Sequence, residues 1–119
     1  MHKNLILFGG LSLFIVHELD AVRRHEWNMF IFLSKPNKEK GYIIFTLLHI
    51  PLFFFIFWGV YQANSVDQTK VMLTLDLFFI LHFFLHLGFI KHRNNEFKSF
   101  FSWFIITVVA LSGVIHLIL

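Results

Sequence analysis

Residues 4–27 of the chain read NLILFGGLSLFIVHELDAVRRHEW. The first 13 of them carry no charge, as in a helix that crosses a lipid bilayer. His17, Glu18 and Asp20 follow, before the two arginines at positions 23 and 24 that mark a membrane surface. A segment that only anchors a protein has no use for these groups, because a charge at the bilayer centre costs about 3 kcal/mol. We therefore predict that they line a polar site buried among membrane helices.

The composition indicates that lipid is the solvent of this chain. Of its 119 residues, 57% are hydrophobic, 14% are charged and 18 are phenylalanines. A soluble domain carries about 25% charged residues, and a soluble chain this short cannot bury so many large apolar side chains. The absence of cysteine excludes disulfides, thiolate ligands and iron–sulfur clusters. Any metal would therefore be held by His, Asp or Glu.

Four stretches are long enough to cross a bilayer, which takes about 20 apolar residues in a helix. They are residues 4–22, 41–62, 71–90 and 97–119. The last two connections are short, so the helices that they join are expected to pack as antiparallel neighbours. We predict an all-α integral membrane bundle of four transmembrane helices, forming a single domain over residues 1–119.

The first connection is longer and mixes charge with large apolar side chains such as Trp27 and Phe30. We expect the first helix to continue past the bilayer as an amphipathic extension that lies in the interface and stops before Pro36. The first segment lacks a small-residue cleavage site and leads directly into the polar residues. We therefore interpret it as mature structure rather than as a secretory signal.

The placement of lysine and arginine predicts the orientation. Of the ten, five lie between residues 23 and 40, three lie between residues 91 and 98, and the other two are Lys3 and Lys70. Positive charge concentrates on the cytoplasmic side of membrane proteins. The first and third connections are therefore expected in the cytoplasm and both termini outside, in a bacterial inner membrane. Membrane lipid is the expected surrounding, and no nucleic-acid partner is expected.

Four histidines share one depth in this bundle. His82 and His86 precede Lys91 by nine and five positions, His17 precedes the arginine pair by six, and His49 follows the end of the first connection by nine. At about 1.5 Å per residue, all four lie roughly 7–14 Å inside the cytoplasmic boundary. Randomly scattered histidines have no reason to agree in depth, so the agreement indicates a common site.

The spacing of these residues predicts a metal site. His17, Glu18 and Asp20 fall on one side of the first helix at about 100° per residue, and His82 and His86, four apart, share a face of the third. His17, Asp20, His82 and His86 together supply nitrogen and oxygen ligands of the kind that suits zinc or iron. We predict that these four residues bind a transition metal.

Two further residues are the predicted catalytic groups. Glu18 lies just off the ligand arc and would act as a general base on a metal-bound water. His49 would be a further ligand or a proton relay. A structural role is the alternative for His49, because Pro51 frees backbone groups that its imidazole would satisfy.

Other interpretations of the cluster stay open. Hydrogen-bonded pairs His17–Asp20 and Glu18–His25 would hold the helices in register, each contributing about 0.6 kcal/mol. Heme is a second alternative, with axial ligands drawn from two facing histidines of this layer. His25 and Glu26 lie close enough to the headgroups to be surface residues.

A second polar pair is expected toward the other face of the membrane. Asp76 and His116 match in depth near the outer surface and lie too far from the main cluster to join it. The pair would serve as a clamp between two helices. If it relays protons instead, a polar path would cross the bilayer.

The motif HELDAVRRHEWNMF resembles the opening of small bacterial membrane proteins of the HXXEE-domain group. The stretch LHFFLHLGFIKHRNNEFKSFFSWFIITVVALSGVIH resembles their second half. Asp20-Ala21 stands where that pattern has paired glutamates, so the sequence departs from it there. The resemblance implies a four-helix membrane protein with polar residues in its core, and it implies no established activity.

Three functions are compatible with these features. The preferred one is a metal-dependent membrane hydrolase or oxidase acting on a hydrophobic or lipid-like substrate that enters from the bilayer. The second is a small ion, proton or metal transporter, or a pore-forming oligomer. The third is a non-catalytic interaction or effector protein, and a homo-oligomer is compatible with all three.

Overall fold

The computed structural model describes residues 2–30, 38–61 and 64–119, and its regular structure there is entirely helical. The elements are α1 (His2–Arg23), the short 3-10 helix η1 (Glu26–Met29), α3 (Lys38–Val60), α4 (Ser65–Gly88) and α5 (Phe100–Ile118). Each of the four α-helices is long and apolar enough to cross a membrane. The predicted all-α architecture of four membrane-spanning helices is confirmed.

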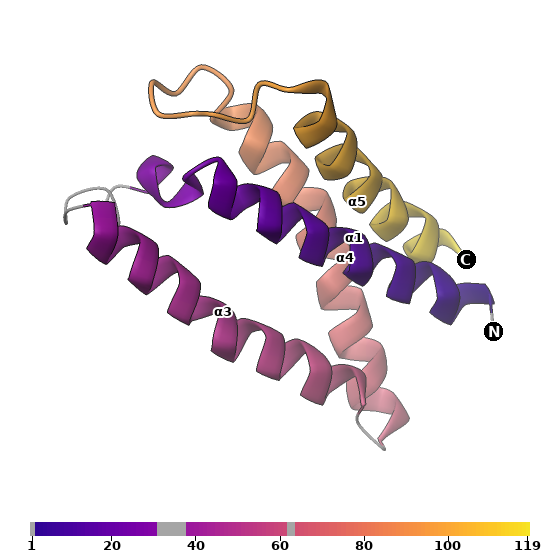
Figure 1. Ribbon diagram of the computed structural model, residues 1–119. Coiled ribbons are helices and arrows are strands. Elements are labelled where there is room, and N and C mark those ends of the chain that lie inside the picture. The colour runs from indigo at the N-terminus through magenta and orange to yellow at the C-terminus, as the bar shows by residue number, and fades with distance from the viewer. Residues whose placement is uncertain (1, 31–37, 62–63) are drawn as a thin grey trace.

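Helix α5 packs along both α1 and α4, and these three helices form the core of the bundle. Helix α3 makes fewer contacts, and most of them are with α4 and with η1. In Figure 1, α3 lies on the side of α1 away from α5, and the two labelled chain ends lie at the same end of the molecule. An even number of spans requires this placement of the termini. Which end faces the cytoplasm stays a prediction.

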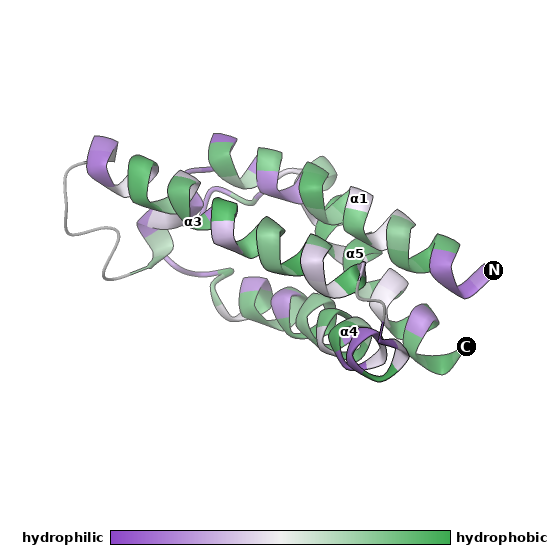
Figure 2. Cartoon of the chain, turned by 90° about the horizontal axis from the view of Figure 1, so that it is seen from below, coloured by the Kyte–Doolittle hydropathy of each residue, from purple (hydrophilic) through white to green (hydrophobic). Residues whose placement is uncertain are grey.

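The helices are apolar over most of their length, with hydrophilic residues concentrated toward their ends and in the connections (Figure 2). Large apolar side chains also remain exposed on the outside of the bundle. Leu19 is 68% exposed, Ile50 66% and Leu81 61%. Such a surface suits a protein whose outer face contacts lipid tails.

Two of the helices begin where a polar side chain caps them. The Asn64 side chain accepts a hydrogen bond from the backbone N–H of Val66 at the start of α4, and Ser99 accepts one from Ser102 at the start of α5. These caps satisfy backbone donors that have no partner within the helix. Helix α4 therefore begins six residues before the predicted span, which starts at residue 71.

The predicted interfacial extension of the first helix is wrong for residues 24–30, and its remainder lies outside the described residues. Helix α1 ends at Arg23, and His25 adopts a left-handed conformation with φ 53°. This conformation reverses the chain direction, so that η1 folds back into the bundle. As a result Glu26 and Trp27 are buried, with exposed fractions of 6% and 4%.

Two glycines permit the close approach of the core helices. A Cβ atom at Gly10 of α1 would overlap the Ser112 hydroxyl of α5. One at Gly113 of α5 would come within 2.9 Å of the Asp76 carbonyl oxygen of α4. Small residues at such crossings let backbones pack tightly in membranes, where dispersion contacts hold helices together.

Candidate metal centre

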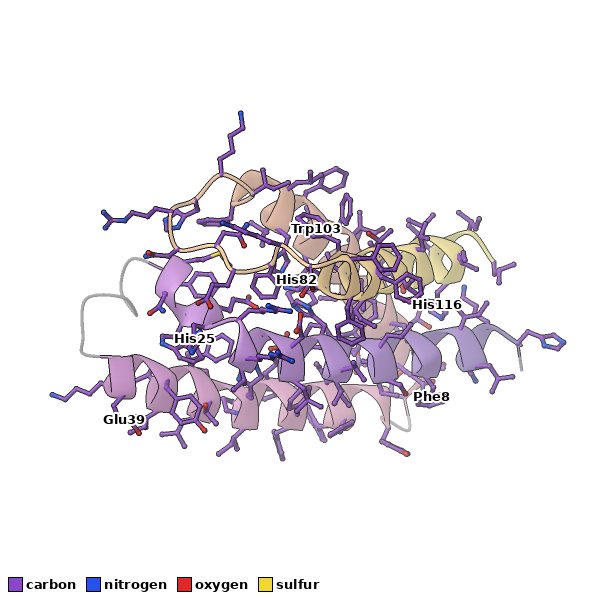
Figure 3. The ribbon with its side chains drawn as sticks, turned by 45° about the horizontal axis from the view of Figure 1, so that its top comes forward. Phe8, His25, Glu39, His82, Trp103 and His116 are labelled. Atoms are coloured by element: carbon purple, nitrogen blue, oxygen red, sulfur yellow. The ribbon has the colours of Figure 1, made fainter. Side chains whose placement is uncertain are left out.

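Three histidines and one glutamate converge inside the bundle. His17 comes from α1, Glu26 from η1, and His82 and His86 from α4. Each offers one ligand atom, and these atoms all lie within 4.8 Å of one another. Figure 3 shows His82 in the interior of the bundle, in contrast to Glu39 at the N-terminal end of α3. The four residues are called the His3Glu cluster below.

The imidazole rings of the cluster touch one another. The ring centroids of His17 and His82 are 4.6 Å apart, those of His17 and His86 are 5.1 Å apart, and those of His82 and His86 are 4.7 Å apart. The Nε2 atom of His17 lies 3.8 Å from Oε2 of Glu26. The helical spacing of His82 and His86 therefore places both on the face of α4 that meets His17, as the sequence predicts.

The cluster contains buried polar atoms without hydrogen-bond partners. Both ring nitrogens of His17 and Oε2 of Glu26 are among them, and the His17 side chain is fully buried. Leaving a buried polar atom unpaired costs about 1–3 kcal/mol, and native proteins pair nearly all such atoms. A small cavity of about 60 Å³ is lined by Glu26, His82 and His86. The cluster thus has lone pairs that could bind a metal ion, and a small cavity lies next to them.

Apolar side chains enclose the cluster along the bundle axis. Phe14 and Phe79 belong to one buried apolar group, and Ala21 and Phe97 belong to another. The ring of Phe14 lies 6.0 Å from that of His82, and the ring of Phe97 lies 4.5 Å from that of His86. Low polarity on both sides strengthens the attraction between a bound cation and its ligands.

Glu26 takes a place in the cluster that sequence reasoning gave to Asp20. Burial, together with the nearby Glu18 side chain, raises the pKa of the Glu26 carboxyl to about 8. The Glu26 carboxyl is therefore mostly protonated at neutral pH while the site is empty. The sequence signal for its role was weak, because Glu26 becomes buried only through the chain reversal at His25.

Asp20 lies apart from the cluster and joins α1 to the start of α5. Ser102 donates a hydrogen bond of 2.6 Å to Oδ2 of Asp20, and the Arg24 side chain lies 3.4 Å from Oδ1. Arg24 also donates to the Ser99 hydroxyl. Both oxygens of Asp20 are thus engaged by protein partners.

Glu18 and His49, the predicted catalytic residues, are hydrogen-bonded to each other through Glu18 Oε2 and His49 Nε2. His49 Nδ1 lies 2.7 Å from the Phe45 carbonyl oxygen, which can only accept, so Nδ1 carries a hydrogen. The contact between Nε2 and Glu18 therefore holds one proton, on one partner or the other. The second oxygen of Glu18 lies 3.9 Å from His17 Nε2. The pair sits beside the His3Glu cluster.

The structure bears on the alternative roles of these residues. His25 pairs with Glu96 at 2.9 Å, while Glu18 pairs with His49, so the expected Glu18–His25 contact is replaced. His49 hydrogen-bonds to the backbone carbonyl of Phe45. Pro51 instead removes the N–H partner of the carbonyl four residues before it, so His49 does not satisfy the group that Pro51 frees.

A bis-histidine heme does not fit this layer. Its two axial imidazoles must lie on opposite faces of a flat macrocycle, but the rings of His17, His82 and His86 contact one another directly. His49 has both ring nitrogens in hydrogen bonds. The arrangement suits a single small ion.

A cavity of about 340 Å³ opens beside the cluster between α1, η1, α3 and α4. Glu18, Glu26, His49 and His82 are its polar wall, and the rest of its lining is apolar. Binding sites for small molecules combine an apolar cavity with a few polar groups in this way. The cavity places space for an apolar molecule next to the candidate ligands.

Asp76 and His116 form the expected pair between α4 and α5. His116 Nδ1 lies 2.7 Å from Asp76 Oδ2, and both residues are 2% exposed. Phe14 and Phe79, each 1% exposed and with ring centroids 5.6 Å apart, pack between this pair and the His3Glu cluster. The two polar groups are separate sites.

We expect metal binding to weaken as the pH falls below about 8, the pKa of the Glu26 carboxyl in the empty site. An incoming ion must displace the proton from Glu26, so the apparent Kd for zinc should rise about tenfold per pH unit lost. Chelator-competition titrations of the purified protein at a series of pH values would measure this slope. Glu26→Gln should bind zinc more weakly and with a flatter slope. A wild-type affinity that does not change over this range would contradict the prediction.

The comparisons with known proteins give the chain a family. The model of a family of unknown function (DUF6713) matches residues 3–119. No curated protein and no solved structure matches the chain. The match does not address the likeness to HXXEE-domain proteins, which stays a prediction.

Proposed function

The chain belongs to this family of unknown function, and we propose from its geometry that it is a metal-dependent membrane enzyme. In this proposal His17, Glu26, His82 and His86 bind a transition metal. The substrate is a hydrophobic molecule that enters from the bilayer of the inner membrane. The observation that carries the proposal is the His3Glu cluster, whose ligand atoms lie within 4.8 Å of one another.

The ligand set favours zinc or iron(II). Three imidazoles and one carboxylate are ligands that both metals accept. Bonds of about 2.0–2.1 Å place the ligand atoms of a tetrahedral zinc site about 3.4 Å apart. A shift of about 1 Å by each side chain would bring the cluster to that geometry. Zinc would support hydrolysis and iron would support oxidation.

Glu18 and His49 are the proposed acid–base groups. They stand beside the cluster without belonging to it, and they hold one proton between them. A water molecule in the neighbouring cavity would lie within reach of Glu18, which also lines that cavity. Proton transfer from this water to the Glu18–His49 pair would generate a nucleophile at neutral pH.

The arrangement favours an enzyme over a transporter. A transporter needs a polar path, and Phe14 and Phe79 pack between the cluster and the Asp76–His116 pair. The cavity beside the cluster instead gives an apolar molecule access to the acid–base pair.

Elemental analysis of the purified full-length protein tests the metal part of the proposal. We expect about one tightly bound zinc or iron ion per chain, as one four-ligand site would hold. Comparing the lipids of cells that express wild type with those that express Glu18→Gln tests the enzymatic part. The variant should keep the metal, and lipids that change with wild type should not change with Glu18→Gln. A protein without metal, or identical lipid changes with both proteins, would overturn the respective part.

A further inference from the structure

A second apolar cavity adjoins the one beside the His3Glu cluster. It has a volume of about 420 Å³ and lies between α3 and α4. Leu52 of α3 and Phe78 of α4 line both cavities, so these two side chains lie at the boundary between them, which we call the neck. Ile56 and Val71 line the second cavity further from the cluster. We refer to the two cavities together as the α3–α4 channel.

The lining of the channel extends along α4. His82 lines its inner part and Val71 its outer part, eleven residues apart on α4. At about 1.5 Å per residue, this separation is about 16 Å. The channel therefore runs along α4 from the His3Glu cluster toward the N-terminal end of that helix.

The channel is polar at one end. Its inner part carries Glu18, Glu26, His49 and His82. In the outer part, Thr74 is the only polar side chain among the described residues of the lining, and its hydroxyl donates to the Lys70 carbonyl. The outer part thus offers an elongated apolar surface and no available hydrogen-bond donor on a side chain.

This polarity matches a molecule with one hydrocarbon chain and one small polar group. We propose that the protein binds a single-chain fatty acyl lipid, with its oxygen-bearing end at the His3Glu cluster and its tail in the α3–α4 channel. The assignment names the substrate class of the proposed enzyme and rests on that proposal for its polar end. Each cavity has the volume typical of a site for one small ligand, about 300–1,000 Å³. A cationic headgroup is disfavoured, because it would face the bound metal ion.

The neck residue Leu52 gives the sharpest test. The protein would be placed in phosphatidylcholine nanodiscs and exposed to palmitic acid that carries a photoreactive diazirine at the end of its tail. Labelled peptides would then be mapped by mass spectrometry. We expect labels near Ile56 and Val71, and we expect excess palmitic acid to remove them.

Leu52→Trp fills the neck and should lower this labelling roughly tenfold, which corresponds to about 1.4 kcal/mol of binding free energy. Phe54→Trp is the matched control, because Phe54 lies two positions away on α3 and is 61% exposed. It should label like wild type. The competition experiment on wild type decides the question if Leu52→Trp does not fold.

Metal content separates this inference from the proposed function. Labels spread over outward residues such as Phe54 and Leu81, without competition, would overturn the channel assignment and show that bulk lipid fills the space. Competed labelling at Ile56 and Val71 in a protein that holds no metal would support the channel and overturn the metal site. Bound metal without labelling at these two residues would overturn the channel alone.

Discussion

His82→Ala is expected to release the bound metal. In the proposed metal site, the substitution removes one of the four candidate ligands of the His3Glu cluster and leaves an apolar gap in its place. Losing a residue that merely supports a ligand costs about 10–100-fold in affinity, so losing the ligand itself should cost more than about 100-fold. Elemental analysis after purification would show metal in the wild-type protein and almost none in the variant. His2→Ala removes an exposed histidine from the same helix as His17 and should keep the metal.

A pair of amide substitutions separates the two candidate carboxylate ligands. Glu26→Gln should lower the metal content, whereas Asp20→Asn should keep it, because Asp20 is hydrogen-bonded to Ser102 instead. Both changes preserve side-chain shape. If Asp20→Asn loses the metal and Glu26→Gln keeps it, the ligand set expected from the sequence is correct. The His3Glu cluster is then not the ligand set.

His116→Ala is expected to destabilise the protein by about 3 kcal/mol, because a buried polar group that loses its hydrogen-bond partner costs up to about that much. It leaves the Asp76 carboxyl buried at 2% exposure without its partner on α5. Reversible unfolding in mixed micelles, followed by circular dichroism, would measure the change. Leu117→Ala, at a neighbouring position that is 41% exposed, is the control and should change stability much less.

The double variant Asp76→Leu with His116→Leu identifies the role of the pair. If the pair acts as a clamp, two apolar side chains of similar size should recover stability to within about 1 kcal/mol of wild type. The metal content should not change, because Phe14 and Phe79 separate the pair from the cluster. A single variant as stable as wild type would contradict the clamp.

Hydropathy predicted the helices well, because a chain in lipid has few ways to hydrogen-bond its backbone N–H and C=O groups. A spanning segment must pair its own amides, so about 20 apolar residues in a row indicate a helix almost by themselves. The ends were harder to predict. Helix α4 begins at Ser65 because Asn64 caps it, a local signal that hydropathy does not register.

The histidines of the site were also predictable, for a geometric reason. Depth follows from counting residues along a helix, and His82 and His86 share a face by their spacing. The carboxylate was not predictable by this reasoning. Glu26 reaches the cluster only because His25 reverses the chain, and Asp20 is drawn away by Ser102, which lies 82 positions later. Such contacts depend on tertiary packing.

Helix α3 supplies part of the channel wall and none of the four candidate ligands. His17, Glu26, His82 and His86 come from α1, η1 and α4, whereas α3 supplies Leu52 and Ile56. Helix α3 is also the one with the fewest contacts to the rest of the bundle. In the proposed enzyme, the choice of acyl chain is therefore separable from metal coordination. Substitutions along α3 away from His49 would retune which chain length or degree of branching is admitted while the four ligands stay in place.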